Sequence, residues 1–203
     1  MSVKPLLHNA WDHFAESLAD RQGWRSAVAG IARTDEFLAA LEFTDPPSAA
    51  AALSDLTVSG WFKEVEGCLK DPETRDSFEG ETLIAGTRED AGFIQVIRGR
   101  TTDRERWTAI NEAMQEVMRT HRPEVLAASI AWFDDDHFSE TVFFTSEQEA
   151  REGESREFPG GMAGLFGELM NLVEDLTYVD VRDPWIKVHP AIDTSSTPLT
   201  EPG

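Results

Sequence analysis

The run Phe93-Ile-Gln-Val-Ile-Arg-Gly-Arg100 decides the fold class, because a capped amphipathic segment follows it directly. Its β-branched and aromatic residues favour a strand. Thr102-Asp103 then offers the side chains that begin helices, and a helix over residues 104–120 is predicted. The apolar positions of that helix recur every three or four residues and predict one buried face. They are Trp107, Ile110, Met114, Val117 and Met118.

The residues that follow predict two more strands, a second helix and a last strand. Residues 125–133 and 138–144 read as a hairpin around the turn Asp134-Asp135-Asp136. A helix over residues 162–174 and a strand over residues 176–181 complete the series. The order is β-α-β-β-α-β, which is the split unit of the ferredoxin-like fold.

The first half of the chain contains a degenerate repeat of this pattern. Phe37-Leu-Ala-Ala-Leu-Glu-Phe-Thr44 aligns with Phe138-Ser-Glu-Thr-Val-Phe-Phe-Thr145 at an offset of 138 − 37 = 101. Gly60-Trp-Phe62 aligns with Gly164-Leu-Phe166 at an offset of 164 − 60 = 104. The shared order of these matches predicts two tandem copies.

The predicted fold class is therefore α+β, with two tandem ferredoxin-like repeats packed as an intramolecular α/β barrel. Residues 1–90 form a degenerate repeat that lacks its first strand, and residues 91–190 form a complete one. The strand-like segment Trp185-Ile-Lys-Val-His189 is a candidate to fill the missing edge. Residues 191–203 are rich in Pro, Thr and Ser and are expected to form a flexible tail.

Composition limits the partners. The 203 residues include 38 acidic and 18 basic ones, which gives a net charge of −20. Phosphate backbones and anionic lipids would repel such a chain, so neither nucleic acid nor a membrane is expected as a partner. No window approaches a membrane span, and the expected location is the cytoplasm. Because both halves of the barrel lie in one chain, a monomer or a weak homo-oligomer is predicted.

The run Phe93–Arg100, the Trp107 helix and Val142-Phe-Phe-Thr-Ser-Glu-Gln-Glu-Ala150 resemble the dimeric α/β-barrel superfamily, and within it the antibiotic-biosynthesis monooxygenase-like group. The pattern Gly-Phe-x-Gln-Val-x-x-Gly-Arg at residues 92–100 is also similar to that of actinobacterial proteins with tandem copies of this strand. The resemblance implies a cavity for a small molecule between sheet and helices. Some members oxidise aromatic polyketides without a cofactor, some degrade heme, and others have no known activity.

The heme-degrading members differ from this chain. They carry an Asn on the first strand, and a Trp and a His on or near the helix after the third strand. Residues 93–100 contain no Asn, and residues 146–158 contain neither Trp nor His. Heme chemistry is therefore not expected, and no cofactor is predicted.

Four residues are candidates to line a ligand pocket. Gln95 and Arg98 are unusual in a largely apolar strand, and alternation places them on opposite faces, so only one can face the interior. The inward one would orient a polar group of a ligand, while Trp132 and Phe144 would supply apolar wall. The structural alternatives are that the protein itself satisfies Gln95 and Arg98, and that Trp132 closes the barrel end by packing.

Asp134-Asp135-Asp136-His137 carries residue types that bind divalent cations. A charged hairpin tip is more typical of a solvated turn, and no metal site is predicted.

Two functions remain open at this point. The first is a monooxygenase-like enzyme, acting without a cofactor on an apolar or aromatic compound. The second is a non-catalytic scaffold that binds a ligand or a protein. The residues assign no acid–base pair or nucleophile, so the sequence leaves open whether the protein is an enzyme.

Overall fold

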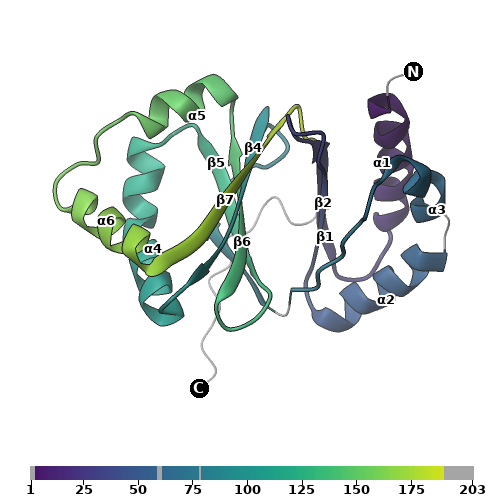
Figure 1. Ribbon diagram of the computed structural model, residues 1–203, viewed down its shortest axis with the longest axis horizontal. Helices are drawn as coiled ribbons and strands as arrows, with labels where there is room; N and C mark the ends of the chain where they lie inside the picture. The colour runs from purple at the N-terminus through teal and green to yellow at the C-terminus, as the bar shows by residue number, and fades with distance from the viewer. Residues whose placement is uncertain (1–2, 59–60, 78, 190–203) are drawn as a thin grey trace.

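Two antiparallel sheets lie face to face, and each carries its helices on the outer side (Figure 1). The computed structural model describes residues 3–58, 61–77 and 79–189. The larger sheet has five strands in the order β3-β5-β6-β4-β7, and the smaller has three in the order β2-β1-β8. The protein thus has a mixed α+β fold of four layers, with two sheets between two sets of helices.

The second half of the chain follows the predicted order. The sheet order β5-β6-β4-β7 is consistent with the ferredoxin-like fold. The Asp103 carboxylate accepts a hydrogen bond from the Arg106 N–H at 3.0 Å and caps the first helix. The elements are β4 (Phe93–Thr101), α4 (Arg104–His121), β5 (Val125–Trp132), β6 (His137–Phe144), α5 (Glu147–Glu154), α6 (Met162–Leu172) and β7 (Val173–Arg182).

The first half contributes strands to both sheets. Strand β3 pairs antiparallel with β5 in the larger sheet, whereas β8 comes from the end of the described chain and pairs antiparallel with β1. Each sheet therefore receives an edge strand from the other half. The elements are α1 (Lys4–Leu18), β1 (Trp24–Ile31), β2 (Phe37–Phe43), α2 (Pro46–Val58), α3 (Trp61–Val65), a 3-10 turn (Glu66–Cys68), β3 (Glu79–Ile84) and, after β7, β8 (Trp185–Val188).

The segment Trp185–His189 was predicted to form the missing edge strand of the first half. It does form a strand, but this strand does not take the place of the missing one. Residues Trp185–Val188 form β8, which pairs with β1. In the second half the first strand, β4, pairs with β6, so the missing first strand of the first half would lie beside β2. The described residues place no strand there. The tail predicted over residues 191–203 lies outside the described residues.

The two sheets are held together by an apolar layer. Val96, Phe143 and Val181 from the larger sheet pack toward Val28 and Ile186 from the smaller. One isolated bridge, between Ala32 and Val181, connects the sheets. The described strands thus form two packed sheets and no closed barrel, which differs from the predicted barrel. Within the described residues, no helix combines the length and apolar character that a membrane span requires.

Gly30 on β1 permits this close approach, because a Cβ there would lie 2.2 Å from Cγ1 of the fully buried Val181. Gly30→Ala is therefore expected to lower the free energy of unfolding by about 1–3 kcal/mol, as overpacking does. Urea denaturation measures the effect. Gly80→Ala is the control, since a Cβ there meets only a carbonyl oxygen at 3.5 Å. A Gly30→Ala variant as stable as wild type would contradict the tight contact between the sheets.

Candidate functional site

Gln95 faces the helices from β4, which lies between β6 and β7 in the five-stranded sheet. It shares this side of β4 with Phe93 and Ile97, which belong to the core between sheet and helices. Its side chain is buried, and Nε2 donates to Oδ1 of Asp180 at 2.9 Å. The other oxygen of Asp180 accepts from Arg151 of α5. The protein therefore satisfies the Gln95 amide through a network that joins β4, β7 and α5.

Arg98 lies on the opposite face of β4, as the alternation of side chains predicts. It donates to Glu36 at 3.0 Å, in the turn between β1 and β2. Arg98 and Tyr178 also line a surface cleft of about 440 Å³ between that turn and β7. Gln95 and Arg98 therefore belong to different sides of the sheet and do not meet in one site.

Trp132 and Phe144 both lie in the core between the five-stranded sheet and its helices. The Trp132 ring meets Trp107 edge-on at 5.3 Å, and the Arg104 guanidinium lies 4.3 Å from its centre. Phe144 packs against Phe93 at 5.7 Å. The buried indole N–H of Trp132 has no acceptor among the described residues. Trp132 thus carries a donor that the described part of the protein does not use.

Glu140, which was not among the residues predicted from the sequence, is a carboxyl on the same apolar face. It lies on β6 between Phe138 and Val142, directly opposite Ile97 of β4 and Ile130 of β5. Its side chain is half-buried and has no hydrogen bond or ion pair to another described residue. The signal was present in the sequence, because alternation in residues 138–144 places Glu140 on the face that is otherwise Phe, Val and Phe.

Burial raises the pKa of the Glu140 carboxyl to about 7, from an ordinary value of 4.5. No cation among the described residues offsets this loss of hydration, since burial is the single cause of the shift. A carboxyl with this pKa is present in both protonation states near neutral pH. It can therefore accept or donate a proton, which is the requirement for general acid–base chemistry.

Helix α6 contacts this side of the sheet without packing tightly. None of its residues is buried, although its Leu169 and Leu172 reach the core that contains Trp132 and Phe144. Phe166 and Met170 are 39% exposed. A two-point ion pair ties α6 to α4, with Arg106 donating to the two oxygens of Glu168 at 2.6 and 2.8 Å. Of the helices on this side of the sheet, α6 is therefore the least tightly packed against it.

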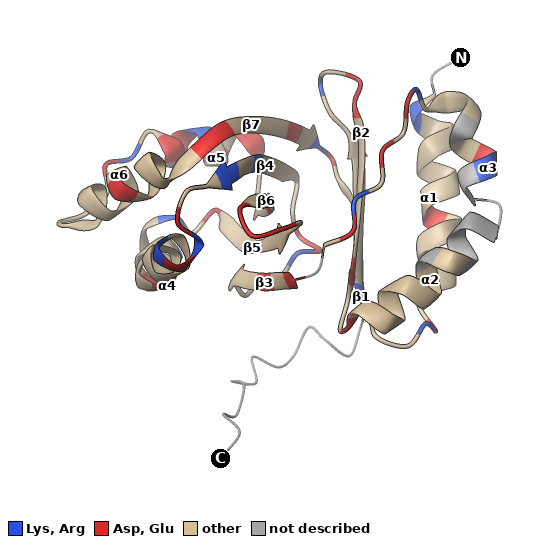
Figure 2. Ribbon diagram, turned by 60° about the horizontal axis from the view of Figure 1, so that its bottom comes forward, with Lys and Arg blue, Asp and Glu red and all other residues tan. Residues whose placement is uncertain are grey.

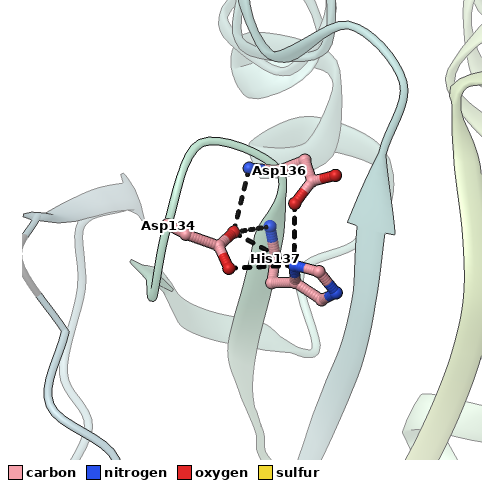
Figure 3. Close-up of side chains that lie close together, drawn as sticks. All are labelled: Asp134, Asp136 and His137. Carbon is pink, nitrogen blue, oxygen red and sulfur yellow. Dashed lines mark hydrogen bonds and ion pairs between the residues drawn. The ribbon is translucent and has the colours of Figure 1, made fainter.

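The charged hairpin tip brings Asp134, Asp136 and His137 together (Figure 3). Oδ1 of Asp134 accepts from the backbone N–H groups of His137 at 2.7 Å and Asp136 at 3.1 Å. These bonds lower the pKa of Asp134 to about 2, and the two carboxylates raise the pKa of His137. The three side chains bond to one another and close the turn.

Comparison with known proteins finds similarity at the level of structure. No protein-family model and no curated protein matches the chain. A proposed monooxygenase from Lactobacillus acidophilus NCFM superposes with a TM-score of 0.68 at 10% identity, over 92% of this chain and 90% of that one. A proposed monooxygenase from Fusobacterium nucleatum gives 0.64 at 10% identity, over 93% and 89%. An anthrone oxidase-like protein gives 0.55 at 8% identity, over 92% and 88%. At these identities the comparison establishes a shared fold.

The pKa of Glu140 predicts how stability depends on pH. The folded state holds a proton that the unfolded chain releases near pH 4.5, so this stabilisation is complete below that pH. It is lost as pH rises toward 7, by about 3 kcal/mol at about 1.4 kcal/mol per pKa unit. Glu140→Gln removes the titration. Relative to wild type, the variant should gain about 2–3 kcal/mol of stability between about pH 4 and about pH 8.

Urea unfolding at the two pH values measures this difference. Glu112→Gln is the matched control, because Glu112 is exposed on α4. If wild type and Glu140→Gln have parallel stability profiles, the carboxyl is hydrated in the folded state and the burial argument is wrong.

Proposed function

We propose that the protein is a monooxygenase-like enzyme that acts without a cofactor on an apolar or aromatic small molecule. The observation that carries this proposal is the Glu140 carboxyl, which lies on an apolar face with a pKa of about 7 and has no partner among the described residues. The shared fold with the two proposed monooxygenases and the anthrone oxidase-like protein supports the same reaction class by analogy.

The proposed substrate site lies between the five-stranded sheet and helices α4 and α6. Ile97, Ile130 and Val142 surround Glu140 and supply apolar contacts. The loosely packed α6 provides the entrance, since the side chains that leave the core when it moves, Leu169 and Leu172, are only partly buried. Trp132 lies two residues along β5 from Ile130, and its unused indole N–H is available to a substrate oxygen.

The chemistry needs one base and dioxygen. Glu140 takes a proton from a weakly acidic CH₂ group that is conjugated with the aromatic rings of the substrate. The carbanion passes electrons to O₂, one oxygen atom becomes a carbonyl oxygen, and the other leaves as water. The substrate loses two hydrogen atoms and supplies all the electrons, so the balance requires no external reductant. A base whose pKa lies near the working pH contributes about 10²–10⁴ in rate.

A tandem origin of the two halves is part of this proposal. The series α1-β1-β2-α2-α3-β3 parallels α4-β5-β6-α5-α6-β7-β8 except that the first half has no strand corresponding to β7 among the described residues, and β3 and β8 pair with equivalent strands of the opposite half. This exchange is what two ferredoxin-like repeats would produce on packing face to face. In such an arrangement only the second half keeps the strand corresponding to β4, so the substrate site lies there.

Anthrone is a suitable probe, because its CH₂ group is flanked by aromatic rings and its oxidation to anthraquinone is visible in the ultraviolet spectrum. Wild type is expected to accelerate oxygen uptake and quinone formation above the uncatalysed rate. Glu140→Gln should lose about 10²–10⁴ of the acceleration, which is the contribution of a general base. Its anthrone affinity, measured by fluorescence titration, should change little.

Glu112→Gln is again the control and should retain full activity. Binding of anthrone without turnover by wild type would favour the alternative, a non-catalytic ligand-binding scaffold. Equal rates for wild type and Glu140→Gln would remove Glu140 from the reaction.

A further inference from the structure

We propose that the outer edge of β2 is a self-association surface that pairs with β2 of a second copy of this chain. Strand β2 is an edge strand, because β1 is its one partner among the described strands. Edge strands carry unpaired N–H and C=O groups that invite a further strand. Ala39 and Ala40, at the middle of β2, are exposed.

The bonding pattern identifies which groups point outward. The Ala32 N–H donates to the Glu36 carbonyl at 2.8 Å, and the register then continues as Gly30–Leu38 and Val28–Ala40. Antiparallel pairs alternate between bonded and non-bonded, so Leu38, Ala40 and Glu42 bond to β1. The residues that direct their backbone groups away from β1 are Phe37, Ala39, Leu41 and Phe43.

Strand β2 is also the least protected of the four edges. Natural edge strands are blocked by charge, shortness or irregular backbone. Strand β3 carries Glu79 and Glu81, β8 has four residues with Lys187 among them, and β7 carries four charges. In Figure 2 several positions of β7 are red, whereas β2 is tan over most of its length.

The single charge of β2, on Glu42, is paired with cations of the same chain. Glu42 accepts from Ser26 at 3.0 Å and pairs with Arg88 and, at 3.5 Å, with Arg25. Although burial opposes ionisation, the pairing with Arg88 keeps the pKa of Glu42 below its usual value. The carboxylate thus remains charged and held within its own copy. It therefore does not repel an approaching strand as a free charge would.

The sequence of β2 is self-complementary in one antiparallel register. With the two-fold axis at Ala40, Phe37 lies opposite Phe43 of the second copy and Ala39 lies opposite Leu41. All four outward residues then form hydrogen-bonded pairs, and no like charges face each other. Aromatic and aliphatic cross-strand pairs of this kind stabilise sheets. This complementarity favours a second copy as the occupant of the edge.

Disulfide trapping tests the register. Ala40 of the two copies would form a non-hydrogen-bonded pair with Cα atoms about 4.5 Å apart, within disulfide range. The exposed Cys68 is first replaced by Ser. Under mild oxidation, Ala40→Cys in this background is expected to give a covalent dimer. Ala113→Cys on the exposed surface of α4 should stay monomeric on a denaturing gel. Equal cross-linking of both variants, or none at Ala40→Cys, overturns the register.

Sedimentation tests the association itself. Wild type should show a concentration-dependent monomer–dimer equilibrium, and Ala39→Lys should weaken it at least tenfold, because a lysine then lies opposite Leu41 in each of the two equivalent pairs and adds two like charges to the interface. Thr177→Lys, which adds the same charge to the exposed edge strand β7, should dimerise like wild type. Circular dichroism verifies that both variants fold. A wild type that remains monomeric at every concentration, or an Ala39→Lys variant that dimerises normally, refutes the proposal.

Discussion

The apolar layer between the two sheets is the constraint on which the rest of the structure depends. Because each sheet is covered by helices on one side and by the other sheet on the opposite side, both faces of β4 must be largely apolar. A polar side chain on either face then needs a specific partner. Gln95 has Asp180 on the helix side, and Glu42 has Ser26 and Arg88 between the sheets. Glu140 lacks such a partner among the described residues, and this sets it apart.

The same constraint explains which parts of the fold could be predicted. The Trp107 helix and the hairpin around Asp134–Asp136 are encoded locally, by periodicity, a cap and turn residues, and the structure confirms them. The partners of β3 and β8 are not encoded locally. Alternation fixes which face a side chain occupies and leaves open which strand lies beside it. The exchange of edge strands, and the absence of a closed barrel among the described strands, therefore required the three-dimensional structure.

The candidate site, like the fold, could be predicted from the sequence only in part. The opposite orientations of Gln95 and Arg98 follow from strand geometry alone, and the structure agrees. The partners of both residues come from β7 and from the β1–β2 turn, which no spacing rule brings near β4. Glu140 could have been recognised as a carboxyl on an apolar face. Its significance depends on Ile130, across the predicted hairpin, and on Ile97, which is distant in sequence, because the two residues remove water from both sides of it.

Two features that lower the stability of the folded protein lie on the helix-covered side of the five-stranded sheet. Ionised Glu140 is unfavourable in its apolar surroundings, and helix α6 above this face buries none of its side chains. A purely structural core would be more stable with an apolar residue at position 140 and a tightly packed helix. Gln95 and Glu42, the polar side chains described above on the other parts of the apolar layers, have partners within the described residues. Local departures from an otherwise consistent design are expected where binding or catalysis limits stability. The coincidence of an unpartnered carboxyl and a loosely packed helix on one face therefore favours a ligand site there over a simple scaffold.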